Sequence, residues 1–281
     1  MTSYMKLSEA QCRALVGAAT AEVVAFHVGF VRLLENQRES DAEVAGSGTL
    51  VLISGGRHAI LTAAHVIEEL PKRGEIGIML EASPSPRLER FTVTVDMLDM
   101  VPIAGASRTA DGPDLALVTV PESIAQEILV RNKAFYNLES RRDRMLEHPP
   151  AVDLGFWGMC GVVEEWTKDL PPERVFSRVK GFHNFFGAGE VSSFETRGAF
   201  DYLKFETRFG RSYEGPDNYG GVSGGGIWQV LVKEQDGEAQ VSECLLSGVD
   251  FYQTVVDGGI DLSCHGRRSI YEHAFAGQPV G

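Results

Sequence analysis

The chain has few cysteines, and they form no disulfide framework. The N-terminal residues join no basic cluster to an apolar run, so the sequence predicts no secretion signal, and no stretch is apolar and long enough to predict a membrane span. Few cysteines and no signal indicate a reducing compartment, so we expect a cytoplasmic protein with no membrane partner. The four cysteines stand far apart, at Cys12, Cys160, Cys244 and Cys264.

Positive charge is also scarce. The 26 Lys and Arg residues face 39 Asp and Glu residues, for a net charge of −13, which disfavours binding to nucleic acids and to anionic membranes. Metal-ligand clusters are equally sparse, because the pair Cys264-His265 stands without nearby partners. We therefore expect neither a nucleic-acid partner nor a metal. With 281 residues, the chain is long enough for two packed barrels but too short for several domains.

Glycine is concentrated around one serine, in the run Gly220–Gly226 with Ser223 near its centre. Glycines let a backbone turn tightly and expose a hydroxyl together with amide N–H groups. Acyl transfer needs both, because the hydroxyl attacks a carbonyl and the N–H groups bind the oxyanion. A flexible linker is the alternative interpretation. However, Ile227–Val232 follows directly and is typical of a core strand, so we predict that Ser223 is a nucleophile.

A nucleophilic serine needs a base, and His65 has the most suitable setting. It ends the stretch Ala59–His65, in which an apolar strand gives way to small residues just before the imidazole. The strand Gly46–Ser54 is expected to form a hairpin with Arg57–Leu61. The remaining histidines lie in no recognisable motif, and we expect them at the surface or hydrogen-bonded in the core: His27, His58, His148, His183, His265 and His273.

The acid that orients such an imidazole should be buried, and Asp114 is the candidate. It stands at the entrance of the apolar stretch Leu115–Val120, where an unpaired carboxylate would be costly to bury. The alternative is an aspartate that caps a turn before the strand. Taken alone, the position does not separate these two interpretations.

Together, three segments resemble the trypsin-like (chymotrypsin-fold) serine peptidases, of the cytosolic bacterial type. Thr62–His65 resembles the histidine motif of that family, Asp114–Leu117 its aspartate motif and Gly221–Gly225 its serine motif. The order His, Asp, Ser and the intervals between the motifs are typical of the family. The resemblance covers most of the chain, roughly from Val23 to the C-terminal segment.

The resemblance implies a serine endopeptidase that works through an acyl-enzyme and needs no cofactor. Ser223 would be the nucleophile, His65 the general base and Asp114 the residue that orients the base. The N–H groups of Gly221 and Ser223 would form the oxyanion hole. Two alternatives stay open: a catalytically silent scaffold that binds a partner protein, and an esterase, because the same triad cleaves esters.

The implied fold is all-β, with two six-stranded antiparallel β-barrels of the chymotrypsin/trypsin fold, an N-terminal helix and a C-terminal helix. We predict a helical extension over 1–22, a first barrel over 23–139 that carries the histidine and the aspartate, and a second barrel over 151–281 that carries the serine. Ser8 and Gln11 form a capping box for the first helix. Arg267–Phe275 resembles the closing helix of the fold. The sequence also predicts one strand over 91–99, a helix over 122–137 and a linker between the barrels over 140–150.

The chain departs from secreted relatives at Val222, where those proteins carry an aspartate that pairs with a newly cut N-terminus. Valine cannot make this ion pair, so we expect no activation by such cleavage. Asp217, counted back from the serine without gaps, falls where members with a basic preference carry an aspartate. A surface turn is the alternative there, and Asp250 and Phe251 are the other candidates for substrate binding. We expect a protein or peptide substrate and a regulatory protein partner.

Overall fold

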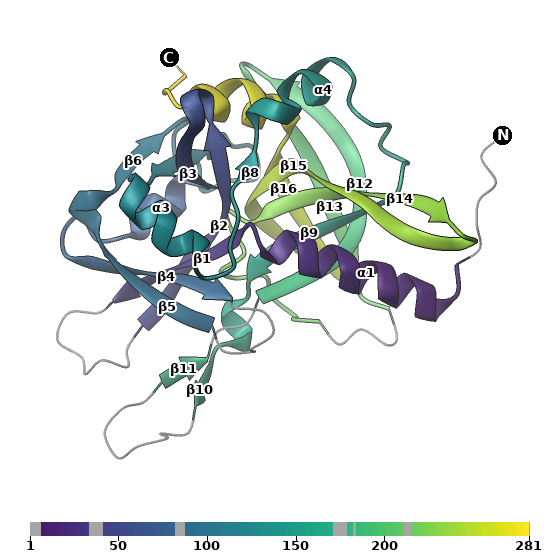
Figure 1. The fold of residues 1–281 in the computed structure, drawn as a ribbon, viewed down its shortest axis with the longest axis horizontal. Coiled ribbons are helices and arrows are strands. Elements are labelled where there is room, and N and C mark those ends of the chain that lie inside the picture. The colour runs from purple at the N-terminus through teal and green to yellow at the C-terminus, as the bar shows by residue number, and fades with distance from the viewer. Residues whose placement is uncertain are drawn as a thin grey trace.

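Two antiparallel β units lie side by side and make up most of the molecule (Figure 1). The protein is represented by a computed structural model. The structure describes residues 7–33, 42–81, 88–170, 179–181, 184–210 and 215–280.

The first unit is a sheet in which the strands follow the order β5-β4-β1-β2-β3-β7-β6, and β8 pairs in parallel with β2. β2 and β3 form the expected hairpin, with Gly55 in the left-handed region at φ 75°. The strands of this unit are β1 (His27–Leu33), β2 (Ala42–Ile53), β3 (Arg57–Thr62), β4 (Glu75–Glu81), β5 (Leu88–Thr94), β6 (Asp99–Pro102), β7 (Ala116–Thr119) and β8 (Tyr136–Asn137).

The second unit is a closed six-stranded barrel in the order β12-β13-β16-β15-β14-β9, and β9 pairs with β12 to complete it. A separate hairpin, β10 (Lys168–Leu170) with β11 (Val179–Gly181), lies outside the barrel. The barrel strands are β9 (Phe156–Val162), β12 (Asn184–Arg197), β13 (Phe200–Arg208), β14 (Gly226–Gln235), β15 (Glu238–Val256) and β16 (Gly259–His265).

The predicted all-β double-barrel fold class is confirmed, although the first unit differs in detail. Its path holds seven strands instead of six, because the stretch predicted as one strand over 91–99 is broken by a 3₁₀ turn at Val95–Met97. Two strands of the second unit, β12 and β16, are absent from the sequence prediction. The segment 122–137, predicted to be helical throughout, is helical only over α3 (Glu122–Leu129) and then enters β8.

The predicted N-terminal helix is confirmed as α1 (Glu9–Val24), and the capping box of Ser8 and Gln11 is formed. The predicted C-terminal helix is a helical segment whose centre, Ser269–Ala274, is π-helical. Among the described residues, no helix is long and apolar enough to cross a membrane. The short helices are α2 (Ala64–Glu69) and α4 (Arg142–Glu147), and 3₁₀ turns lie at Ser54–Gly56, Glu139–Arg141 and Glu164–Trp166.

An aromatic cluster fills the junction between the two units. The ring of Phe26 stacks on Trp228 of the second unit, with centroids 5.7 Å apart. Tyr136 of the first unit meets both rings edge-on, at 5.4 Å from Phe26 and 5.3 Å from Trp228. Because Tyr136 and Trp228 are almost fully buried, this cluster is a continuous apolar contact across the junction.

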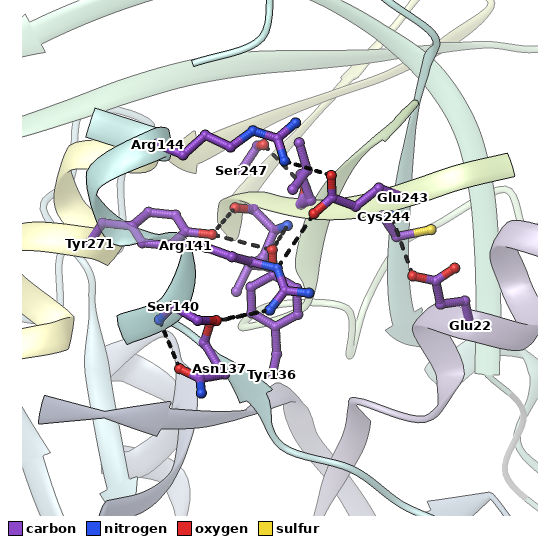
Figure 2. A network of polar contacts seen from close by, with 12 residues as sticks. Glu22, Tyr136, Asn137, Ser140, Arg141, Arg144, Glu243, Cys244, Ser247 and Tyr271 are labelled. Atoms are coloured by element: carbon purple, nitrogen blue, oxygen red, sulfur yellow. Dashed lines mark hydrogen bonds and ion pairs between the residues drawn. The ribbon is translucent and has the colours of Figure 1, made fainter. Parts of the chain in front are cut away.

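A polar network near Tyr136 links α4 and the C-terminal helix to β15 (Figure 2). The hydroxyl of Tyr271, in the C-terminal helix, donates to the carbonyl oxygen of Leu246 on β15 at 3.0 Å. Arg144 on α4 pairs with Glu243 on β15 at 2.7 Å. Residues 140–150, predicted as a linker, are thus partly helical and are held against the second barrel.

Candidate active site

His65 lies where the first sheet ends. β3 finishes at Thr62, and the small residues Ala63 and Ala64 lead directly into α2, so that the imidazole stands on the first turn of a short helix. Ala63 and Ala64 are almost completely buried, which allows the chain to turn tightly here. The side chain of His65 keeps 15% of its surface exposed.

His65 and Asp114 form a hydrogen-bonded pair, as the motifs predict. The Nδ1 atom of His65 lies 2.7 Å from Oδ2 of Asp114. The backbone N–H of His65 donates to Oδ1 of the same carboxylate at 2.9 Å. Because both carboxylate oxygens are acceptors, Nδ1 carries the proton and Nε2 keeps its lone pair free. Asp114 is fully buried, so this pairing also satisfies its charge.

A second histidine, His265, accepts a hydrogen bond from the backbone of Asp114. The backbone N–H of Asp114 donates to Nε2 of His265 at 2.9 Å, and Nδ1 of His265 lies 3.3 Å from the Oγ atom of Ser269. Burial, reinforced by the charge of Arg197, lowers the pKa of His265 to about 3. His265 is therefore neutral at pH 7, with its proton on Nδ1. The Ser269 hydroxyl continues the chain to Oδ1 of Asp201 at 2.8 Å.

The glycine-rich loop before β14 presents Ser223 with two free N–H groups. Within the part of the chain that the structure describes, the N–H groups of Gly221 and Ser223 donate no hydrogen bond. Gly221 has φ 87°, and a Cβ atom there would lie 2.8 Å from Cγ1 of Val44 and 2.9 Å from the carbonyl oxygen of Val162. Only glycine fits this position without strain.

The carbonyl groups of the loop fix the direction of these N–H groups. The carbonyl oxygen of Gly220 accepts from the N–H of Glu164 at 2.8 Å, and that of Val222 accepts from the N–H of Gly225 at 2.7 Å. In a trans peptide the N–H points away from the C=O, so both free N–H groups point away from these partners. The loop thus already has two oriented donors, as an oxyanion hole requires.

The loop packs against the strand end that carries His65. A Cβ atom on Gly224 would lie 2.1 Å from Oγ1 of Thr62 and 3.0 Å from the backbone nitrogen of Ala63. This close approach brings Ser223 to the segment Thr62–His65. Among the described residues, no hydrogen bond joins Nε2 of His65 to Oγ of Ser223. Catalytic hydrogen bonds are often longer without substrate and tighten in the complex.

The three candidate substrate-binding residues lie in different surroundings. Asp217 is exposed in the loop before Ser223. Asp250 and Phe251 are buried on β15. The backbone of Asp250 pairs with the residues after the serine: its carbonyl accepts from the N–H of Gly224 at 2.7 Å. Their role in substrate binding stays a prediction.

Asp250 is a second buried carboxyl near Asp114. Burial is the largest cause that raises the pKa of Asp250 well above its usual range, and the charge of Asp114 adds to the shift. Its Oδ1 atom has no hydrogen-bond partner among the described residues. A neutral Asp250 avoids placing a second buried negative charge beside Asp114.

The other described histidines are divided between the core and the surface, and both ring nitrogens of the buried His27 lack the hydrogen bond expected of a core histidine among the described residues. His27 and His265 are buried, His148 is exposed, and His183 lies outside the described residues. Cys264 and His265 are consecutive on β16, and no three His, Cys, Asp or Glu side chains of the described residues are grouped so that they could hold a metal ion.

Two residues of the site went unrecognised in the sequence. His265 stands on a strand that was not predicted, so nothing indicated that it would face Asp114. Ser47 is fully buried on β2 and its N–H donates to the carbonyl oxygen of Ser223 at 2.7 Å. The run Gly46-Ser47-Gly48 was an available signal for Ser47. Glycines within a strand often mark a close approach of another backbone, and a serine between them can hydrogen-bond to it.

Two buried histidines predict that acid destabilises the fold. Burial, with the charge of Lys133 second, lowers the pKa of His27 to about 3, as for His265. Between pH 6.5 and about 3, the unfolded chain binds protons that these folded histidines do not. The stability that depends on these two neutral histidines is therefore fully present above pH 6.5. It is lost as the pH is lowered, by up to about 1.4 kcal/mol per pH unit for each histidine. Asp250, with its raised pKa, opposes this slope in part.

Urea unfolding at pH 7 and pH 5 measures this effect. His265→Gln is expected to reduce the loss of unfolding free energy between these pH values, since it removes one titrating group. His148→Gln, at an exposed position, serves as the control and is expected to leave the loss unchanged. Equal losses in the wild type and in His265→Gln would contradict the prediction.

Comparisons with known proteins give a likeness in fold only. No protein-family model matches the chain, and no curated protein matches it. Among solved structures, the chain is similar to the protease domain of MamO from Magnetospirillum magneticum in its apo form, with 14% identity. The match covers 89% of this chain and 96% of that chain, with a TM-score of 0.43.

Proposed function

We propose that the protein is a serine endopeptidase with the triad Ser223, His65 and Asp114. One observation carries this proposal: a serine with two free and oriented N–H groups packs against the strand end that leads to a partly exposed histidine, whose aspartate partner is fully buried. A scaffold that only binds partners would not need this arrangement. The substrate class is a protein or peptide.

The geometry supports acyl transfer in two steps. Nε2 of His65 takes the proton of the Ser223 hydroxyl while Oγ attacks the carbonyl carbon of the scissile bond. The N–H groups of Gly221 and Ser223 stabilise the resulting oxyanion, each by about 3 kcal/mol in the transition state. His65 then gives its proton to the leaving amine, and water hydrolyses the acyl-enzyme by the same route. Asp114 holds the imidazole in the tautomer that this cycle needs.

The same observations support activity without a new N-terminus. Val222 is fully buried in the core of the second unit, where a Cβ atom on Gly161 would lie 2.7 Å from its side chain. The carbonyl contacts with Glu164 and Gly225 orient the N–H groups, and among the described residues no hydrogen bond joins this loop to residues 7–24. We also propose a cytoplasmic location and a regulatory protein partner. Asp217 would give the site a preference for basic side chains.

Labelling with a fluorophosphonate probe tests the proposal. The purified chain, beginning at Met1, is expected to form a covalent bond between Oγ of Ser223 and phosphorus, with fluoride leaving. Ser223→Ala is expected to remove the label completely. Mass spectrometry of the labelled species checks that the N-terminus is intact.

Three results would contradict the proposal. Absence of labelling in the wild type would favour the silent scaffold. Label found only on N-terminally trimmed chains would show that cleavage is needed after all. Hydrolysis of small esters without any cleavage of peptides would favour the esterase.

A further inference from the structure

We propose that Ser47 is a positioning residue that holds the oxyanion hole in shape from the neighbouring β unit. This inference rests on the proposed peptidase function, because the hole has a purpose only in acyl transfer. Ser47 lies on β2 of the first unit, whereas the loop that it contacts, Gly220–Gly225, belongs to the second.

Ser47 uses all of its polar groups, and each has a partner in the loop, on β9 or on β3. Its Oγ–H donates to the carbonyl oxygen of Gly221 at 2.8 Å, and Oγ accepts from the N–H of Val162 at 2.8 Å. Its backbone N–H donates to the carbonyl oxygen of Ser223 at 2.7 Å. Its own carbonyl oxygen accepts from Oγ1 of Thr62 at 2.7 Å. One residue therefore joins the loop to β9 and to the strand that leads to His65.

With these contacts, the carbonyl groups of four consecutive residues, 220–223, are all hydrogen-bonded. The carbonyls of Gly220 and Val222 are held by Glu164 and Gly225, as described above. Ser47 holds the two carbonyls that alternate with them, those of Gly221 and Ser223. A peptide plane with a bonded carbonyl cannot rotate without breaking that bond, so the N–H groups between the planes are fixed too. Without the Ser47 hydroxyl, the peptide group between Gly221 and Val222 would lose its anchor, whereas the backbone N–H of residue 47 would still hold the carbonyl of Ser223.

The position admits little except serine. Glycines flank it because the strand is crowded on both sides: a Cβ atom on Gly46 would lie 2.9 Å from the carbonyl oxygen of Ser223, and one on Gly48 would lie 2.5 Å from Cγ2 of Ile60. Alanine at Ser47 would remove the partner of the partly buried carbonyl of Gly221 and of the buried N–H of Val162. Groups orphaned in this way seek new partners, and the loop can move to reach them.

The expected kinetic signature is specific. An oxyanion hole acts in the transition state and contributes little to ground-state binding, so its distortion lowers kcat and leaves KM nearly unchanged. We expect Ser47→Ala to lower kcat by about 10- to 100-fold, less than the loss of a whole donor. Ser47→Cys, with a weaker donor of similar shape, is expected to fall in between.

The experiment compares Ser47→Ala and Ser47→Cys with Thr207→Val. Thr207 is a buried threonine on β13 whose Oγ1 donates to the carbonyl oxygen of Ile260 at 3.0 Å, away from the loop. Thr207→Val removes one buried hydrogen bond, so this variant is the control for a loss of stability. Steady-state kinetics on a peptide substrate give kcat and KM. In parallel, NMR hydrogen exchange follows the hydrogen-bonded loop amides of Val222, which donates to Tyr219, and of Gly225, which donates to Val222.

The two readouts separate the two proposals. Faster exchange of the loop amides in the Ser47 variants, but not in Thr207→Val, supports the positioning role even if the wild type cleaves no peptide. In that case the proposed function fails and the Ser47 inference stands. Unchanged loop exchange in folded Ser47→Ala, or an unchanged kcat in an active enzyme, would overturn the inference. Loss of kcat to the same extent in Thr207→Val would overturn it as well.

Discussion

Alanine at position 223 is expected to lower kcat for a peptide substrate by about 10⁶-fold, and His65→Ala is expected to have a similar effect. Ser223 carries the hydroxyl next to the two free N–H groups of the loop, those of Gly221 and Ser223. His65 is the base that makes this hydroxyl reactive. Because the two side chains act as one unit, the double variant is expected to be no worse than either single variant.

Steady-state kinetics with each variant measure this effect. Ser242→Ala is the matched control, because its hydroxyl donates to the carbonyl oxygen of Leu231 at an exposed position. It should retain full turnover. Turnover of Ser223→Ala within ten-fold of the wild type would remove Ser223 from the proposed mechanism.

Asp114→Asn is expected to lower kcat by about 10⁴-fold while the protein stays folded. The backbone N–H of His65 needs an acceptor, so the amide oxygen of Asn takes the place of Oδ1. The amide NH₂ then faces Nδ1 of His65, which must become an acceptor and move its proton to Nε2. A protonated Nε2 cannot accept the proton of Ser223, so the base is lost although the shape is kept.

This prediction can be checked at two levels. Kinetics give the loss of kcat, and proton NMR shows whether the imidazole proton has moved from Nδ1 to Nε2. Asp111→Asn, at an exposed aspartate that pairs with Arg197, is the control and should keep its turnover. A kcat of Asp114→Asn near the wild-type value would mean that Asp114 does not set the tautomer.

The parts of the site that could be predicted are those encoded by short stretches. The turn at Ala63 and Ala64 and the glycines around Ser223 are local consequences of residue size, so the motifs reveal them directly. The pairing of His65 with Asp114 follows from the order of these motifs. The long helix α1 was predictable for the same reason, because a capping box is made within four residues.

The remainder depends on contacts between distant parts of the chain. Ser47 meets Gly221 across 174 residues, and Asp114 meets His265 across 151 residues, so no local pattern encodes either contact. β12 was not predicted, since many of its side chains are exposed and its sequence lacks a clear apolar alternation. The position of Asp217 came from counting through a loop, where the side chain is exposed.

The aromatic junction described above has an optical consequence. Trp228 is one of three tryptophans and is packed between Phe26 and Tyr136 of the other half. Its indole becomes exposed to water when the two β units separate. Trp157 and Trp166 lie away from this junction, in the second unit. A chain that retains only Trp228 would therefore report the opening of the junction by a red shift of its emission.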